Sequence, residues 1–286
     1  MKKIIATGKG GVGKTTTLSA LCLMMAREGK KVIVFDTDPS MNLAMTFGIP
    51  FDAVSTITED KAAISEDIEE HGIEESAPEI LEEHSVLTED GIRIVIMGAI
   101  EHGGDGCLCS AISTIGMLLE YTEGLGEYDI ALVDSQAGPE VLGRGLASEF
   151  DLNLILTEPT TKSSEVSRQV LKLGNDLGVK DSLMVVNMID EPEDVARTAD
   201  MVKISKDRAI GIRFDRCVVK ADRAGELLPD VYPDSDAVAD LRAVKAAVEK
   251  CIGRTDGIGS ARADSTGHPA ATPSRISNYR SPASAA

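Results

Sequence analysis

The chain has 286 residues, of which 43% are hydrophobic and 27% are charged, as in ordinary globular proteins. Its formal net charge of −18 repels the phosphates of nucleic acids and anionic membranes, and we find no local basic patch, so we expect no nucleic-acid partner and no membrane partner. No apolar run approaches the roughly 20 residues that span a bilayer. Five irregularly spaced cysteines and the lack of an apolar leader favour a cytoplasmic protein with free or metal-bound thiols over a disulfide framework.

Short runs rich in Ile and Val alternate with longer segments of helical period, which is typical of parallel strands joined by crossover helices. The runs are apolar on both faces, and this indicates a sheet covered by helices on both sides. We therefore predict an α/β fold with a doubly wound, mostly parallel sheet and helices on both faces. The predicted strands are Lys3–Thr7, Lys31–Asp36, Ile92–Met97, Ile130–Asp134, Leu152–Thr157, Leu183–Asn187 and Ala209–Arg213.

Composition divides the chain into one domain over residues 1–252 and a tail over residues 253–286. The domain is interrupted at residues 51–90 by an acidic helical insertion, in which Pro78 is expected to divide two helix-like pieces. Its charge is typical of a solvated surface, and a docking surface is the alternative. The tail is rich in Gly, Ser, Ala, Pro and Thr and has no periodic apolar set, so we predict that it is disordered.

The first predicted strand runs into G-K-G-G-V-G-K-T-T, residues 8–16, and then into a helical pattern. This fits the phosphate-loop motif G-x-x-x-x-G-K-[ST] in its strand-to-helix context, where Lys14 reaches the terminal phosphates and Thr15 can bind Mg²⁺. Glycines let successive backbone N–H groups face a phosphate at the helix N-terminus. The predicted nucleotide-binding residues of the loop are Gly8, Gly10, Gly11, Val12, Gly13, Lys14, Thr15 and Thr16.

Lys9 is a second lysine at the start of this loop, and we expect it to point outward because it cannot easily fold back on phosphates that its own backbone wraps. With it, K-G-G-V-G-K-T-T resembles the deviant phosphate loop of the dimeric ATPases that include the nitrogenase iron protein and the septum-positioning ATPases. The resemblance implies ATP hydrolysis in a homodimer, in which Lys9 contacts the partner's phosphates and acts with Lys14 in catalysis.

Two further segments are similar to the same superfamily. D-T-D-P-S-M-N, residues 36–42, follows the second predicted strand, and a carboxylate just past a strand end faces ligand in open α/β sheets. The resemblance implies that Asp38 orients or activates the attacking water. D-S-Q-A-G, residues 134–138, follows the fourth predicted strand, which places Asp134 in the outer Mg²⁺ shell and the Gly138 N–H where it can sense a γ-phosphate.

The choice of base is indicated at the sixth predicted strand. Asn187 matches the superfamily residue that pairs with adenine, and the resemblance favours ATP. Asp190 gives an N-x-x-D spacing similar to that of GTP-binding proteins, and Arg213 stands where relatives often carry Pro, so some GTP tolerance stays open.

Cys107 and Cys109 lie one residue apart in G-D-G-C-L-C-S. Two thiolates held that close repel each other until a cation neutralises them, so we favour metal binding by this pair over a redox role or a structural role. We expect His102 to be a solvated loop residue rather than a metal ligand. Zn²⁺ and Ni²⁺ thiolate sites usually take four ligands and one chain supplies two, so a two-fold axis through the metal is the economical arrangement. The remaining cysteines are predicted to be core or inert thiols: Cys22, Cys217 and Cys251.

The C-x-C pair, together with A-G-P-E-V-L-G-R-G at residues 137–145, resembles the CooC-type ATPases that assist nickel insertion into carbon monoxide dehydrogenase. The resemblance covers residues 1–250 and implies a metallochaperone that binds Ni²⁺ or Zn²⁺ between two chains, with carbon monoxide dehydrogenase or a related nickel enzyme as its client. One alternative is an electron-transfer ATPase like the nitrogenase iron protein, which the lack of Cys in residues 134–145 disfavours. Another is a spatial-positioning ATPase, which would need an amphipathic C-terminal helix or a basic surface.

Overall fold

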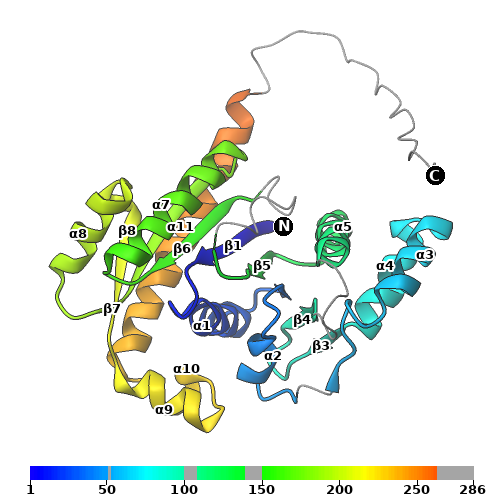
Figure 1. The fold of residues 1–286 in the computed structure, drawn as a ribbon, viewed down its shortest axis with the longest axis horizontal. Helices are drawn as coiled ribbons and strands as arrows, with labels where there is room; N and C mark the ends of the chain where they lie inside the picture. The colour runs from blue at the N-terminus through cyan, green and yellow to red at the C-terminus, as the bar shows by residue number, and fades with distance from the viewer. Residues whose placement is uncertain (51–52, 100–107, 139–149, 263–286) are drawn as a thin grey trace, which may run out of the picture.

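The computed structural model of the chain describes residues 1–50, 53–99, 108–138 and 150–262 (Figure 1). In these residues eight strands form one sheet in the order β3-β4-β2-β5-β1-β6-β7-β8. All neighbouring strands are parallel except β3 and β4. The strands are β1 Lys2–Gly8, β2 Val32–Asp36, β3 Ser85–Leu87, β4 Arg93–Ile96, β5 Ile130–Asp134, β6 Leu152–Thr157, β7 Asp181–Ile189 and β8 Ala209–Arg213.

Helices connect these strands and cover the sheet on both faces (Figure 1). Helices α1, α2 and α11 contribute to the hydrophobic layer on one face, and α4, α5 and α7 contribute to the layer on the other. The helices of the described residues are α1 Lys14–Arg27, α2 Asn42–Thr46, α3 Lys61–His71, α4 Ile73–Glu83, α5 Cys109–Leu125, α7 Thr161–Asp176, α8 Glu193–Val202, α9 Arg216–Ala224, α10 Leu228–Val231 and α11 Asp236–Arg262, with a short 3₁₀ turn at Lys206–Arg208.

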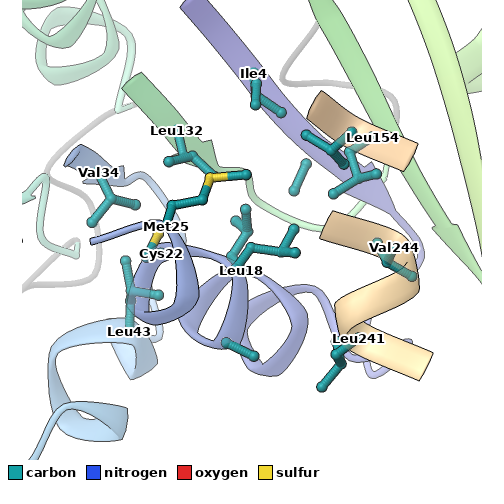
Figure 2. Packing of buried hydrophobic residues seen from close by; sticks show 14 of the residues in the cluster. Ile4, Leu18, Cys22, Met25, Val34, Leu43, Leu132, Leu154, Leu241 and Val244 are labelled. Atoms are coloured by element: carbon teal, nitrogen blue, oxygen red, sulfur yellow. The ribbon is translucent and has the colours of Figure 1, made fainter. Parts of the chain in front are cut away.

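The two layers follow from the alternation of side chains along each strand. In β1, Ile4 packs in the layer of α1 and α11, whereas Ile5 packs in the layer of α5 and α7. Figure 2 shows the first layer, where Leu18 and Cys22 of α1 lie in a cluster with Ile4 and with Val244 of α11. Burying each large aliphatic side chain of this kind stabilises the fold by about 1.5–3 kcal/mol. The predicted fold class, a doubly wound and mostly parallel sheet, is confirmed.

All seven predicted strands are present, and one strand was missed. β3 has only three residues and lies inside the segment predicted as a helical insertion, where it pairs antiparallel with β4 at the edge of the sheet. A strand of three residues is too short to show the alternation of apolar and polar side chains that marks a strand in the sequence. An edge strand also need not have a wholly apolar face. The predicted acidic helical insertion at residues 51–90 does contain two helices, but it also contains this strand, which was not predicted.

The break between the two helices of the insertion also differs from the prediction. Pro78 lies inside α4 and does not divide the helices. The chain turns instead at Gly72, where φ is 85° and ψ is 160°, a backbone conformation that is open mainly to glycine. Pro78 only removes one backbone donor from a helix whose Ile80 and Leu81 are buried against α5, so packing retains the helix.

The last helix, α11, extends through Arg262, so the predicted tail boundary at residue 253 falls within a helix. Its buried apolar positions follow a helical period from Val238 through Leu241, Val244 and Val248 to Ile252, directly before the predicted boundary. Residues 263–286 of the predicted tail lie outside the described residues. None of the described helices combines the length and the apolar character needed to cross a membrane.

Asp151 ties the start of β6 to the start of β1. Its carboxylate accepts hydrogen bonds from the Lys3 backbone N–H and the Lys180 ammonium, both at 2.9 Å. Burial acts to raise the pKa of Asp151, but these two bonds and the charge of Lys2 outweigh it and hold the pKa below its usual range. A carboxyl with a depressed pKa adds stability above its unfolded pKa and loses it as the pH falls through the folded pKa.

Asp151→Asn is therefore expected to lower the free energy of unfolding at pH 7 by about 1–3 kcal/mol, because a buried charged acceptor is lost. The difference from wild type should shrink as the pH falls below about 4, where the carboxyl of the unfolded chain is protonated. Urea unfolding across this pH range measures both effects. Asp176→Asn, an exposed change at the end of α7, is the control, and an equal loss at acid and neutral pH would contradict the assignment.

Candidate functional site

The carboxyl ends of three central strands meet at one edge of the sheet. β5 lies between β2 and β1, so Asp134 at the end of β5 lies beside both Asp36 of β2 and the loop that leaves β1. A pocket of about 740 Å³ opens there. Its wall includes the predicted site residues Gly10, Gly11, Gly13, Lys14, Thr15, Thr16 and Asp38, together with residues of α2, α9 and their flanking loops.

The phosphate loop connects β1 to α1, as predicted. Gly13 immediately precedes α1 with φ 89°, and a Cβ added there would lie 2.4 Å from the Asn187 amide nitrogen, so only glycine fits. Val12 is fully buried and anchors the loop in the core, while Gly10 and Gly11 are exposed to the pocket. The N-terminus of α1 thus faces the pocket with the backbone N–H groups of its first turn, an arrangement suited to an anion.

Lys14 is the buried cation of the site. It is 6% exposed, and its ammonium donates to the Lys9 carbonyl oxygen at 3.4 Å. Burial lowers the pKa of Lys14, and the nearby carboxylates of Asp134 and Asp38 oppose this shift. One positive charge thus lies near two negative ones, and a phosphate entering the pocket would meet the Lys14 ammonium with little competing water.

Thr15 and Asp134, the two residues predicted to hold Mg²⁺, are in direct contact. The Thr15 hydroxyl donates to Asp134 Oδ2 at 2.6 Å, and Asp134 Oδ1 is buried without a hydrogen-bond partner among the described residues. Burial raises the pKa of Asp134 to about 6, with the Thr15 bond and the Lys14 charge acting against it and the Asp38 charge adding to it. A hydroxyl oxygen can coordinate Mg²⁺, and an unsatisfied carboxylate oxygen can accept a hydrogen bond from a water bound to the ion, so these residues fit Mg²⁺.

Asp38 lies on the pocket wall in a turn between β2 and α2. Its Oδ1 accepts hydrogen bonds from the Ser40 N–H at 3.0 Å and from the Ser40 hydroxyl at 2.7 Å, and Asn42 Nδ2 donates to that hydroxyl at 2.9 Å. These hydrogen bonds hold the Asp38 carboxylate in one orientation on the wall of the pocket that the phosphate loop also lines. Its role toward the attacking water stays a prediction.

Asp36 is a residue that the sequence reasoning missed. It is fully buried, and its carboxyl accepts from the N–H of Asp38 at 3.1 Å and from the N–H of Leu43 at 3.2 Å, so it fixes both ends of the turn that carries Asp38. Burial, followed by the charge of its sheet neighbour Asp134, raises the pKa of Asp36 well above its ordinary value. The signal was the first Asp of D-T-D, which ends a buried strand and cannot reach solvent.

Asn187 lies behind the loop. Its amide Nδ2 donates to the Val12 carbonyl oxygen at 2.9 Å, and its Oδ1 accepts from the Met188 N–H at the same distance. Met188 has φ 58° at a bulge between β7 and β8, and its side chain lines the pocket. The contact between Asn187 and adenine stays a prediction.

The other residues weighed for base choice, Asp190 and Arg213, do not line the phosphate-loop pocket. Asp190 lines a different pocket, with Glu158 and Arg197, so the structure does not bring its N-x-x-D spacing to the phosphate-loop pocket. The Arg213 guanidinium is engaged by the Asp240 carboxylate through two bonds of 2.9 Å. The sequence reasoning missed Val218 and Val219 of α9, which line the far side of the main pocket and carry no motif that marks them.

Gly138 touches the phosphate loop directly. Its N–H donates to the Gly8 carbonyl oxygen at 3.0 Å. The segment that follows β5 is therefore tied to the loop through the same N–H group that the sequence analysis assigned to sensing a γ-phosphate. Residues 139–149, which include most of the G-P-E-V-L-G-R-G motif, lie outside the described residues.

The cysteine pair is described in part. Cys109 is the first residue of α5 and is exposed, whereas Cys107 and His102 lie outside the described residues. In the part of the chain that the structure describes, no three His, Cys, Asp or Glu side chains are grouped to hold a metal ion. Cys22 and Cys251 are buried, as predicted, and Arg208 donates to the Cys251 sulfur at 3.1 Å. Cys217 is half-buried.

Comparison with known proteins agrees with this geometry. The family described as CobQ/CobB/MinD/ParA nucleotide binding domain matches residues 3–228. The carbon monoxide dehydrogenase accessory protein CooC of Rhodospirillum rubrum is 31% identical over 265 residues, which is 90% of this chain and 99% of CooC. An uncharacterised ATP-binding protein of Methanocaldococcus jannaschii is 31% identical over 85% of this chain and 95% of its own.

Solved structures share the fold at lower identity. The MinD cell division protein of Aquifex aeolicus has a TM-score of 0.63 at 24% identity, over 90% of this chain and 97% of its own. MinD of Pyrococcus horikoshii, solved with Mg-ADP, has a TM-score of 0.65 at 20% identity, over 92% of this chain and 100% of its own. The matched residues contain β1, the phosphate loop, Asp38 and Asp134. The chain belongs to the CobQ/CobB/MinD/ParA family of nucleotide-binding domains and is a P-loop ATPase.

Proposed function

We propose that this ATPase is a metallochaperone, which binds Ni²⁺ between two copies of the chain and assists its insertion into a nickel enzyme such as carbon monoxide dehydrogenase. The R. rubrum relative supports this client, because that protein is a carbon monoxide dehydrogenase accessory protein and is matched over nearly its whole length. The same site could hold Zn²⁺, since thiolates bind both ions.

The observation that carries the proposal is the position of Cys109. α5 ends at Leu125, shortly before β5 begins at Ile130 at the amino edge of the sheet, so its first residue lies toward the carboxyl edge that also holds the phosphate loop. A helix N-terminus favours negative charge, and the thiolate is the form of cysteine that binds metal. A change in the nucleotide pocket and a change at the Cys109 thiol therefore occur at the same edge of the sheet.

Two thiols per chain leave a four-ligand metal short of two donors. Cys107 and Cys109 from each of two chains supply four, and an isologous contact repeats the same surface on both partners. Metal binding and dimerisation are then thermodynamically linked, so each raises the apparent affinity of the other by the same factor.

Cys107→Ser and Cys109→Ser are each expected to abolish tight binding of Ni²⁺ or Zn²⁺ and metal-promoted dimerisation. ATP binding should be retained, because α5, which begins at Cys109, contributes no residue to the nucleotide pocket. Metal content after loading, together with sedimentation, should give about one metal per two chains in wild type. Cys217→Ser is the matched control, since this half-buried thiol of α9 lies on another element. One metal per chain, or undiminished binding in the pair variants, would contradict the shared site.

Lys9→Ala tests the proposed nucleotide-dependent dimer. If Lys9 contacts the partner's phosphates, the variant should bind ATP like wild type but lose ATP-dependent dimerisation and most of its hydrolysis, because the positive charge missing from each site belongs to the other chain. Sedimentation with a non-hydrolysable ATP analogue measures the dimer directly. A variant that dimerises and hydrolyses ATP normally would remove the role of Lys9 between chains.

A further inference from the structure

Helices α4 and α5 leave a groove between them on the face of the sheet opposite α11. The groove has a volume of about 410 Å³ and is lined by Ile73 and Glu74 of α4 and by Met117, Glu120, Tyr121 and Leu125 of α5. Glu74 and Glu120 are exposed, one on each helix, and Leu125 is 42% exposed. The groove thus offers apolar surface between two carboxylates.

The surroundings of the groove are acidic. α4 contains five glutamates and neither lysine nor arginine, and α3 adds Glu66, Asp67, Glu69 and Glu70 with a single lysine, Lys61. A segment that fits this surface should carry apolar side chains for the floor and positive charges at both ends.

The chain itself contains such a segment beyond the described residues. In S-R-I-S-N-Y-R, residues 274–280, Arg275 and Arg280 flank Ile276 and Tyr279. No acidic residue follows Asp264, so this part of the tail carries positive charge in a protein whose net charge is −18. A segment without a core of its own can still order against a surface that supplies one.

The path of α11 brings the tail to the correct edge of the sheet. Asp240, near the start of α11, contacts Arg213 at the end of β8, whereas Cys251 contacts Arg208 just before β8 begins. α11 therefore runs antiparallel to β8 and ends at the amino edge. The α5 end of the groove lies at the same edge, because β5 begins at Ile130, shortly after Leu125.

The length of the tail is sufficient. Residues 263–274 can span about 40 Å when extended. α11 packs on β7 and β8, and the four strand spacings between β7 and β2 amount to about 19 Å. Crossing from the α11 layer to the α5 layer on the other face adds about 20 Å, at roughly 10 Å for each packed layer. The extended tail is therefore just long enough to pass round the amino edge and reach α5.

We propose that residues 274–280 dock in the groove between α4 and α5 of the same chain, with Ile276 and Tyr279 on the apolar floor and Arg275 and Arg280 paired with Glu74 and Glu120. The tether gives the segment a high effective concentration at the groove, so a modest intrinsic affinity is enough. The docked tail covers part of the acidic surface, so other basic partners can bind there only after the tail is displaced.

The chain has four tyrosines and no tryptophan, which makes the full-length protein suitable for fluorine NMR after labelling with 3-fluorotyrosine. Tyr121 lines the groove and Tyr279 lies in the proposed segment, whereas Tyr128 and Tyr232 lie elsewhere and report whether each variant is folded. In wild type, Tyr279 is expected to resonate away from its position in a free peptide of residues 273–282. It should also be broadened several-fold less than that peptide by a soluble gadolinium chelate.

Charge reversal on either side should release the segment. The double change Arg275→Glu with Arg280→Glu, and separately Glu120→Arg, should each move Tyr279 to the free-peptide position and shift Tyr121, with Tyr128 and Tyr232 unchanged. Glu70→Arg makes the same change of charge on exposed α3, outside the groove lining, and should leave Tyr279 docked.

Three results would overturn the proposal. Tyr279 at the free-peptide position in wild type would mean that the tail is not docked. Release of Tyr279 on dilution of the protein would assign the groove to the tail of a second copy. Equal release by Glu70→Arg and Glu120→Arg would reduce the effect to general attraction toward an acidic face. None of these results depends on nickel binding, so the proposed metallochaperone function is tested separately.

Discussion

Lys14→Ala is expected to lower the rate of ATP hydrolysis by about 10³-fold or more, because the γ-phosphate loses the fixed cation that faces its developing charge in the transition state. Lys14 is buried at the start of α1, beside Asp134 and Asp38, and no mobile surface lysine can replace a charge held in this position. Steady-state phosphate release, measured with saturating Mg²⁺ and ATP, gives the effect.

The substitution has a second consequence at the same site. Without the ammonium, the carboxylates of Asp134 and Asp38 face each other without a compensating charge, so the empty pocket repels a nucleotide more strongly. ATP affinity should therefore fall along with the rate. Lys30→Ala removes an exposed lysine just beyond the far end of α1 and is expected to leave both quantities unchanged. Near-normal turnover in Lys14→Ala would mean that the pocket is not the site of hydrolysis.

The sequence was most informative about the sheet. Strands such as Val32–Asp36 are buried on both faces and therefore read as unbroken apolar runs, which few other structures produce. The insertion was harder to predict because its structure depends on packing. Pro78 stays in a helix since α4 is buried against α5, and β3 forms because β4 offers an open edge. Neither condition can be read from local composition.

The residues of the candidate site also differ in how far the sequence alone could place them. Lys14 and Thr15 could be placed from the phosphate-loop motif alone, and Asp134 from its position at a strand end, because short-range geometry fixes them. Asp36 ends a buried strand in the same way and could have been noticed, but Val218 and Val219 could not, since their relation to the pocket depends on the approach of α9, which is distant in the sequence. The bond between Asn187 and Val12 joins residues 175 positions apart and likewise has no sequence signal.

Asp38→Asn is expected to lower the rate of hydrolysis by about 10²–10⁴-fold, if this carboxylate handles the attacking water, because an amide cannot take up a proton or attract one by charge. ATP binding should be retained. The asparagine carbonyl oxygen can still accept from the Ser40 N–H and hydroxyl, and Asp36 still holds the Asp38 N–H, so the turn keeps its shape. Single-turnover hydrolysis and binding of a non-hydrolysable analogue separate the two quantities.

Charge and geometry can be distinguished at this position with Ser40→Ala. This variant removes the hydroxyl that donates to Asp38 Oδ1 at 2.7 Å but leaves the carboxylate and the Ser40 N–H in place, so it should cost far less rate than Asp38→Asn. The Asp38 charge also raises the pKa of Asp134, so its removal should favour ionised Asp134 and cannot weaken the Mg²⁺ site by that route. A loss of rate in Asp38→Asn with intact nucleotide binding is then attributable to the water. Full activity would reduce Asp38 to a residue that shapes the turn.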